Sequence, residues 1–299
     1  MKIFAPDYYK NFKCLMGECK HSCCIGWEID IDSETAEYYK GIGGEFGERL
    51  RKNIDFGGEC SCFCLDENER CPFLNKEGLC DIILNIGEDS LCQICDDHPR
   101  FRRFYDSRTE MGIGLCCEAA AKLILEKADK TVLEKIDENE EIYYFSEEEE
   151  DFFKNRDKIF AILQNREKSI AERIKDAFSL YGAEVPEFDL ENWAEFHLGL
   201  ERLDEKWTEV LENIKNRPEN PETMDETAAE QLLCYLVFRH FSMEEELVSL
   251  GFCVLGFYMI EKAAESVGIF EAARLWSSEI EYSDENKDLI LDKLFEEVF

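Results

Sequence analysis

Cysteine is the most constraining feature of this sequence, because it is concentrated at one end of the chain. Thirteen of the fifteen cysteines precede residue 118, and only Cys234 and Cys253 follow it. The stretch CKHSCCIGW at residues 19–27 alone contains three of them. A chain of 299 residues with 45% hydrophobic residues can form a core without covalent staples. The clustered thiols therefore need a chemical explanation, whereas Cys234 and Cys253 are expected to be buried core residues.

The sequence favours a cytoplasmic, reducing compartment. Its first residues, MKIFAPDYYKNFKC, contain no apolar run typical of a secretory signal. No stretch of about 18 or more consecutive apolar residues is present either, so no membrane-spanning helix is expected. Clustered thiols in such a compartment usually bind a metal or act in catalysis. A disulfide-rich scaffold and a set of merely buried small thiols are the less favoured alternatives.

The net charge of −34 is unevenly distributed, with −8 on residues 1–117 and −26 on the remainder. Such an acidic surface repels nucleic-acid phosphates and anionic lipid headgroups, so neither a nucleic acid nor a membrane is expected as a partner. It would attract basic groups such as a substrate lysine. Solvation of acidic helices is the simpler explanation of the same charge.

The segment 1–117 is rich in cysteine and glycine, and its pattern predicts short elements joined by turns. Residues 27–32 (WEIDID) alternate like a half-buried strand, and Ser33 is placed to cap the helix that follows. GIGGEFG (41–47) is expected to be a loop. Residues 100–115 predict two extended runs around a turn near Asp106 and Ser107, which would bring Cys116 and Cys117 to the start of the next helix.

From Glu118 onward the pattern is helical, with few glycines and prolines. EEEED (147–151) is expected to start a helix, and Pro186, RPENPE (217–222) and Gly268 mark breaks. The expected helices cover 118–136, Phe152 to Phe178, 193–214, 223–241, 243–267, 270–280 and 284–299. The predicted fold is therefore mainly α: a cysteine-rich metal-binding segment with short strands (1–117) packed on an acidic all-α helical bundle (118–299).

The spacing of the cysteines restricts the kind of metal site. A zinc ribbon would need two C-x-x-C knuckles, and only Cys92 to Cys95 provides one. The C-x3-C-x2-C motif of radical enzymes would need cysteine at position 26, which is Gly26. Zinc and an iron–sulfur cluster both stay possible. Because neighbouring side chains point apart in an extended chain, Cys23 and Cys24 are not expected to bind one small ion together.

Five blocks of the sequence occur in the order found in a known family. They are Cys14-x4-Cys19-x3-Cys23-Cys24-x-Gly26-Trp27, CPFL (71–74), GLC (78–80), CDDHPR (95–100) and LCCEAA (115–120). This pattern resembles the flagellin lysine N-methylases, which belong with the wider cysteine-cluster proteins described as zinc- or iron-chelating domains. The resemblance covers about the first 125 residues, and the helical remainder is compatible with it.

The resemblance implies an enzyme that transfers methyl groups from S-adenosylmethionine to lysines of flagellin and contains a cysteine-bound [4Fe-4S] cluster, with zinc as the alternative metal. Eight thiols exceed the four that one cluster needs, and five further cysteines have no counterpart in the pattern. The positions that match the family pattern are Cys14, Cys19, Cys23, Cys24, Cys71, Cys80, Cys95 and Cys117. The additional thiols are Cys60, Cys62, Cys64, Cys92 and Cys116.

No Gly-rich turn follows a first strand, so a Rossmann-type methyltransferase domain is not expected. Trp27 could wall the cofactor site, and Arg100 could pair with the cofactor carboxylate. Arg102 and Arg103 are expected in surface salt bridges. A lysine ammonium must lose a proton before it attacks a methyl group. The candidate groups for this proton transfer are Asp96, Asp97, His98, Tyr105 and Glu118, and the catalytic residue stays unassigned.

The sequence therefore predicts a protein-lysine methyltransferase with flagellin as its protein partner. A zinc or iron–sulfur scaffold without methyltransferase activity is one alternative, and a redox module is the other. Metal and sulfide content of anaerobically isolated protein distinguishes the metals, and labelling of flagellin distinguishes the enzyme from the two alternatives.

Overall fold

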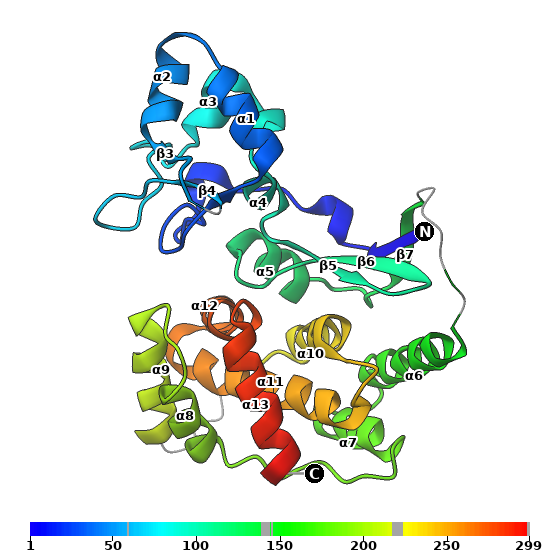
Figure 1. Ribbon diagram of the computed structural model, residues 1–299. Helices are drawn as coiled ribbons and strands as arrows, with labels where there is room; N and C mark the ends of the chain where they lie inside the picture. Colours follow the sequence, from blue (N-terminus) through cyan, green and yellow to red (C-terminus); the bar gives the residue numbers. More distant parts are fainter. Residues whose placement is uncertain (59, 139–143, 145, 217–223, 298–299) are drawn as a thin grey trace. The chain divides into compact units, whose positions relative to one another are not determined.

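The computed structural model describes residues 1–58, 60–138, 144, 146–216 and 224–297 (Figure 1). Internal contacts divide the chain into a smaller unit, Lys13–Phe101, and a larger unit that combines Met1–Phe12 with Arg102–Phe299. Helices predominate in the described residues and the strands form two small sheets, which confirms the mainly α class. The boundary expected after residue 117 was based on where the cysteines lie in the sequence. The division by internal contacts is a different criterion, so that boundary stays a prediction.

Short elements build the smaller unit, as its turn-rich sequence predicts. Its three-stranded sheet has the order β2-β4-β3, and both strand pairs are antiparallel. The elements are β2 (Asp30–Ile31), α1 (Ser33–Gly41), α2 (Gly44–Lys52), β3 (Ile54–Asp55), β4 (Ser61–Phe63), α3 (Asp81–Ile86) and α4 (Gln93–Asp97).

Two local predictions in this unit were wrong. The strand expected over 27–32 is reduced to β2, and Asp32 rather than Ser33 caps α1, because the Asp32 carboxylate accepts the Thr35 N–H at 2.9 Å. The stretch 41–47 is not a loop throughout, since α2 begins inside it. Gly47 allows the tight corner between α1 and α2: a Cβ there would lie 1.9 Å from the Ile42 carbonyl oxygen.

Aromatic side chains fill the core of the smaller unit. Tyr39 and Phe73 are fully buried and Phe63 nearly so. The rings of Phe63 and Phe73 meet edge to face with centroids 5.3 Å apart, a favourable arrangement for aromatic pairs. The Tyr39 hydroxyl donates to the Ser90 carbonyl oxygen at 2.6 Å, so its buried polar atom is satisfied.

The larger unit contains a four-stranded sheet of order β5-β6-β1-β7. The strands are β1 (Lys2–Pro6), β5 (Arg100–Phe104), β6 (Arg108–Ile113) and β7 (Leu133–Glu138). β1 pairs with β6 in parallel and with β7 antiparallel. The hairpin expected over 100–115 is confirmed as β5 and β6, closed by a hydrogen bond from Tyr105 N–H to the Arg108 carbonyl at 3.0 Å. It leads to α5 (Glu118–Leu125), whose N-cap is Cys117, as predicted.

The helix expected over 118–136 was wrong in its second half. The chain leaves α5 after Leu125 and forms β7, so the part beyond residue 117 is not all α. The register joins Pro6 to Leu133 and Phe4 to Lys135. Pairing with β1, a strand more than a hundred residues earlier, therefore overrides local helix propensity.

Helices make up the rest of the larger unit (Figure 1). They are α6 (Glu147–Leu163), α7 (Ile170–Ser179), α8 (Leu190–Leu198), α9 (Glu205–Asn216), α10 (Glu226–His240), α11 (Glu246–Val267), α12 (Ile269–Trp276), a π-helical turn (Ser277–Glu281) and α13 (Asp284–Glu297). The expected helix start at EEEED and the break at Gly268 are confirmed. The expected break at 217–222, position 223 and positions 298–299 lie outside the described residues.

Two expected long helices are each divided. α6 and α7 separate before Ser169, whose side chain forms a capping box with Glu172. α8 and α9 separate at a turn held from elsewhere in the chain. The buried Glu279 carboxylate accepts the N–H groups of Leu203 at 3.0 Å and Asp204 at 2.6 Å.

The helix α11 lies in the core of the larger unit. It is long and apolar enough to cross a membrane by length and composition, contrary to the expectation that no such segment exists, but 72% of the relevant window is buried inside the protein. Cys253 on α11 and Cys234 on α10 are both buried, as expected for core cysteines. Burial of α11 on all sides is typical of a core helix.

Candidate functional site

Five thiols of the smaller unit gather at its core. Cys71 and Cys92 are buried members of the hydrophobic cluster, and Cys24, Cys80 and Cys95 pack against it while partly exposed. The sequence pattern had included four of these five and had set Cys92 aside. We call these five cysteines the thiol group.

Backbone pairing explains why three separate stretches meet in the thiol group. The Cys71 N–H donates to the Cys24 carbonyl at 2.9 Å, and the next residues form a bridge between Ile25 and Arg70. The Leu74 N–H donates to the Cys71 carbonyl at 3.1 Å. Leu74 also forms an isolated antiparallel β-bridge with Cys80. The pairing of Cys24 with Cys71 joins segments far apart in sequence, so sequence spacing alone does not reveal it, whereas the contacts among Cys71, Leu74 and Cys80 are local.

The C-x-x-C pair supplies the other two members. Cys92 is the N-cap of α4, and the Cys95 N–H donates to the Cys92 carbonyl at 3.0 Å. A hydrogen bond from the Cys95 thiol lowers the pKa of Cys92, and the same bond, together with burial, raises the pKa of Cys95 far above its usual range. The C-x-x-C spacing was the signal by which sequence reasoning could have included Cys92.

The remaining thiols of the group differ in their readiness to ionise. A hydrogen bond from Cys23 lowers the pKa of Cys24 to about 7, with smaller help from Ser22 and the charge of Arg70, against the opposing effect of burial. Burial raises the pKa of Cys71 to about 12 and also raises that of Cys80. Cys24 and Cys92, whose pKa values are both lowered, are therefore the members of the group that ionise most readily.

Four of the eight predicted metal ligands lie elsewhere than the thiol group. Cys14 is exposed, and its sulfur accepts the Met16 N–H at 3.3 Å. Cys19 is half-buried and Cys23 is exposed. Cys117 belongs to the larger unit as the N-cap of α5.

The additional cysteines 60, 62, 64 and 116 also lie outside the thiol group. Cys60 and Cys64 are exposed. Burial, followed by a hydrogen bond with Glu28, raises the pKa of Cys62 to about 11. Burial likewise raises the pKa of Cys116, in the larger unit, to about 12.

The predicted cofactor residues lie near α4. The indole N–H of Trp27 donates to the Cys23 carbonyl at 2.7 Å, and its ring centroid is 6.2 Å from that of His98. Arg100 donates to the Asp96 carbonyl at 2.7 Å, at the end of α4. Trp27 and Arg100 are thus positioned on the side of the smaller unit that carries the C-x-x-C pair.

The candidate proton acceptors have different environments. Burial lowers the pKa of His98 to about 4, so this imidazole is neutral at pH 7. Burial raises the pKa of Tyr105. Asp96 and Asp97 are on α4, and Glu118 is the first residue of α5. These residues are divided between the two units, so no single site is defined by all five.

The expected role of Arg103 in a surface salt bridge was wrong. Arg103 donates to the carbonyl oxygens of Phe238 and Phe241, both at 2.7 Å, at the C-terminal end of α10. A cation there satisfies helix-terminal carbonyls and interacts favourably with the helix dipole. Arg102 is exposed, as expected for a surface residue.

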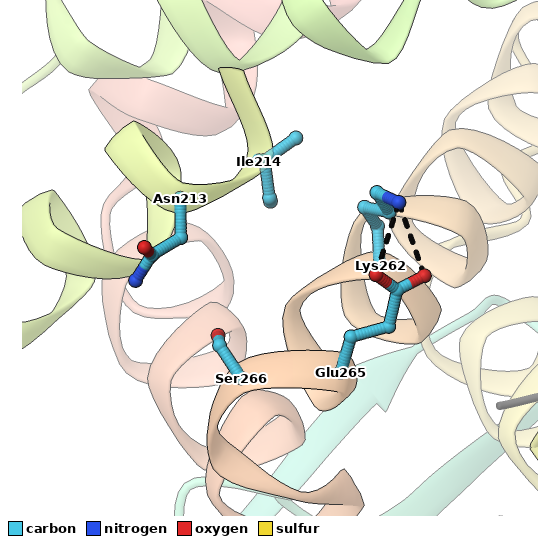
Figure 2. Close-up of a pocket in the computed structure, with 5 residues that line it drawn as sticks. All are labelled: Asn213, Ile214, Lys262, Glu265 and Ser266. Carbon is cyan, nitrogen blue, oxygen red and sulfur yellow. Dashed lines mark hydrogen bonds and ion pairs between the residues drawn. The ribbon is translucent and has the colours of Figure 1, made fainter. Parts of the chain in front are cut away.

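Hollows in the described part of the chain include two of different size. One of about 460 Å³ lies beside α4 and carries only acidic charge; it is lined by Asp32, Glu34, Thr35, Glu88, Asp89, Leu91, Gln93 and Asp96. The other, of about 10 Å³, lies between α9 and α11 (Figure 2) and is lined by Asn213, Ile214, Lys262, Glu265 and Ser266. The second hollow has room for about one water molecule, and its Lys262 is already paired with Glu265 at 3.0 Å.

The donor chemistry of the thiol group fits a thiolate-bound metal centre, because zinc and iron–sulfur clusters both take cysteine sulfur. The sulfurs converge on one core, and Cys24 is easily deprotonated. Among the described residues, however, no three His, Cys, Asp or Glu side chains have the geometry to hold a metal ion. The thiols are thus brought near one another without being arranged as ligands.

The fold and the thiol group define a mainly helical protein with a thiol-rich smaller unit. Comparison with curated proteins narrows this class. The chain is similar to the "Lysine-N-methylase" of Salmonella choleraesuis and of Salmonella typhimurium, with 26% identity over 135 residues, 42% of this chain and 33% of each relative. It is equally similar to the "Flagellar biosynthetic protein FliU" of Salmonella muenchen, of which the match covers 79%. The names of these relatives agree with the resemblance that the cysteine pattern shows to the flagellin lysine N-methylases.

The match spans a third of the length of the two lysine-N-methylases (33%). No family model matches the chain. No solved structure matches it either.

Proposed function

We propose that this protein is an S-adenosylmethionine-dependent lysine N-methyltransferase that acts on flagellin and contains a cysteine-bound [4Fe-4S] cluster. The observation that carries the proposal is the similarity to two proteins named lysine-N-methylase and one named flagellar biosynthetic protein FliU. The relatives' names give the reaction and the flagellar context, and the cysteine pattern suggests the cluster.

Cys24, Cys71, Cys80 and Cys95 are the proposed cluster ligands. Support comes from their convergence on one core, with each contributed by a different block of the family pattern. A [4Fe-4S] cluster needs four thiolates, so this set is sufficient without Cys14, Cys19, Cys23 or Cys117. Cys92, hydrogen-bonded to Cys95, is the proposed fifth thiol beside the cluster.

When bound, the cluster would supply iron for thiolate coordination and S-adenosylmethionine would supply an electrophilic methyl group. The thiols of the chain would have to lose their protons before they bind iron. Cys71 and Cys95 hold theirs tightly in the unloaded protein, so loading would release protons from them. Trp27 and Arg100 are the proposed cofactor contacts, because both lie near the C-x-x-C helix.

The test uses the full chain, reconstituted anaerobically with iron and sulfide, then incubated with flagellin and methyl-labelled S-adenosylmethionine. We expect label on flagellin lysines and about four irons and four sulfides per chain. A loaded protein that leaves flagellin unlabelled would contradict the methyltransferase proposal. Stoichiometric zinc without labile sulfide in anaerobically isolated protein would contradict the cluster and indicate a zinc site instead.

A redox module is the second candidate, favoured by the hydrogen-bonded Cys92 and Cys95 at the start of α4. Thiols in this motif often exchange with disulfides. Reversible oxidation of this pair by glutathione disulfide, in a protein that transfers no methyl group, is the result expected of such a module. Either function needs reduced thiols, so a cytoplasmic location is proposed for both.

A further inference from the structure

The larger unit contains a group of arginines whose charge is not balanced by the acids beside them. Arg156 is fully buried and binds Glu110 with two hydrogen bonds, of 2.8 and 2.5 Å. Arg108 forms an ion pair with the same carboxylate at 2.5 Å. One buried carboxylate therefore faces two guanidinium groups.

The third arginine of the group, Arg103, adds a further positive charge, and Asp157 does not cancel it. Arg103 interacts with helix-terminal carbonyls rather than with an acid. Asp157 influences Arg108 and Arg156 electrostatically but is exposed to solvent on α6. A buried charge without a full partner is costly, so the group favours an additional negative charge.

Several donor atoms in this group are also unused. In the described part of the chain, the buried atoms Tyr105 Oη, Arg108 Nε, Arg108 Nη2 and Arg156 Nε have no hydrogen-bond partner. The contact of Arg108 Nη2 with Glu110 is an ion pair whose direction does not make a hydrogen bond. Native proteins leave few such atoms unpaired, and an ion or water usually accounts for them.

Two of the residues with unused atoms share a neighbour. Tyr105 and Arg108 both pack on Phe153, with the ring centroids of Tyr105 and Phe153 5.0 Å apart and the Arg108 Cζ 3.3 Å from the Phe153 centroid. Arg108 keeps 17% of its side-chain surface exposed, so part of this side chain reaches solvent although its unpaired nitrogens are buried.

We propose that Arg108 and Tyr105 form an oxyanion-binding site that takes a carboxylate or a phosphate. Nε and Nη2 lie on one edge of a guanidinium and form the fork that binds two oxygens of one oxyanion. A spherical halide would not use both members of the fork in the same way, and a neutral water would leave the charge unbalanced. The Tyr105 hydroxyl is the additional donor. The site is independent of the proposed methylation.

The test is thermal unfolding of the full chain in sodium phosphate, sodium acetate and sodium chloride at one ionic strength. We expect Tm to rise saturably with phosphate, acetate or both, by about 4 °C relative to chloride near saturation. A response to acetate alone identifies a carboxylate site, and a response to phosphate alone identifies a phosphate site.

Variants separate this site from general salt effects. Arg108→Lys keeps the charge but loses the fork, and Tyr105→Phe loses only the hydroxyl, so both should lose most of the oxyanion-dependent rise. Arg102→Lys, an exposed arginine of the same hairpin, should keep it. In chloride, Tyr105→Phe should be no less stable than the unaltered protein, because its hydroxyl has no partner to lose.

The proposal is overturned if neither oxyanion raises Tm above its value in chloride, or if all three variants respond as the unaltered protein does. A clear drop in Tm for Tyr105→Phe in chloride would also overturn it, since the hydroxyl would then have a partner within the protein.

Discussion

Cys23 and Cys24 are neighbours in sequence but have different environments. Cys23 is exposed, whereas Cys24 packs against the core beside Cys71 and Cys80. The two residues are in a turn closed by a hydrogen bond from the Ile25 N–H to the Ser22 carbonyl at 3.2 Å, and of the two only Cys24 packs against the core. The exposed thiol still affects its neighbour, because its hydrogen bond is the largest cause of the lowered pKa of Cys24.

This difference gives a prediction about cluster loading. Cys24→Ala should lower the iron bound after anaerobic reconstitution by more than half, because it removes a proposed cluster ligand. Cys23→Ala should load almost normally, as should the control Cys64→Ala, an exposed cysteine of the same unit. Iron and sulfide content per chain is the measurement. Equal losses for Cys23→Ala and Cys24→Ala would refute the assignment of Cys24 alone.

The buried pair of Glu110 and Arg156 gives a prediction about stability. Glu110→Gln removes a charge and leaves Arg156, which is fully buried, without its counterion. The free energy of unfolding should fall by about 3–5 kcal/mol in urea titrations. The control Glu150→Gln breaks an exposed pair with Lys154 and should change it by less than about 1 kcal/mol. Similar losses for both variants would contradict this account.

Turns, helix starts and helix ends that depend on a few neighbouring residues were predicted correctly from the sequence. The turn at Asp106 and Ser107, the helix start at EEEED and the end of α11 at Gly268 follow from turn, dipole and glycine preferences that act within a few residues. The sequence also contains the capping box of Ser169 and Glu172. The apolar periodicity continues on both sides of it, so one helix was predicted where α6 and α7 are separate.

Non-local contacts determined what the sequence did not reveal. β7 forms because it pairs with β1, and the turn before α9 is held by the distant carboxylate of Glu279. The thiol group has the same origin, since the approach of Cys24 to Cys71 depends on backbone pairing across nearly fifty residues. The cysteine pattern identified the thiols of interest but could not show which of them meet.

The corner between α1 and α2 can be tested with two glycines. Gly47→Ala should destabilise the smaller unit by about 1–3 kcal/mol, because its Cβ would collide with the Ile42 carbonyl, a backbone atom that cannot rotate away. Gly41→Ala is the matched control, with no atom within 4 Å of the added Cβ. Urea unfolding of each variant is the measurement, and a Gly47→Ala variant as stable as the control would disprove the tight corner.

For the molecule as a whole, buried histidines link stability to pH. Burial lowers the pKa of both His197 and His240, in the larger unit, to about 4. The unfolded chain binds these protons as pH falls below about 6.5, whereas the folded chain binds them only near the lowered pKa. Their contribution to stability is therefore present above about pH 6.5 and is lost as pH falls toward 4.

His197→Phe tests this linkage. Between about pH 6 and 5 the unaltered protein should lose up to about 1.4 kcal/mol of unfolding free energy per pH unit for each such histidine. In the variant, the slope of unfolding free energy against pH should be shallower by the contribution of one histidine. The variant also loses the hydrogen bond to the Trp193 carbonyl, which lowers its stability at every pH. Urea titrations at several pH values measure the slopes, and parallel slopes would rule out His197 as a contributor.

β1 has a further consequence, which concerns the order in which the chain is made. It lies between β6 and β7 in the sheet, yet its partners are translated only after the whole of Lys13–Phe101. During synthesis the first strand must wait with both edges unpaired, while the smaller unit already has its complete sequence. The smaller unit, with its thiol group, therefore has an interval in which it can fold before the rest of the protein is synthesised.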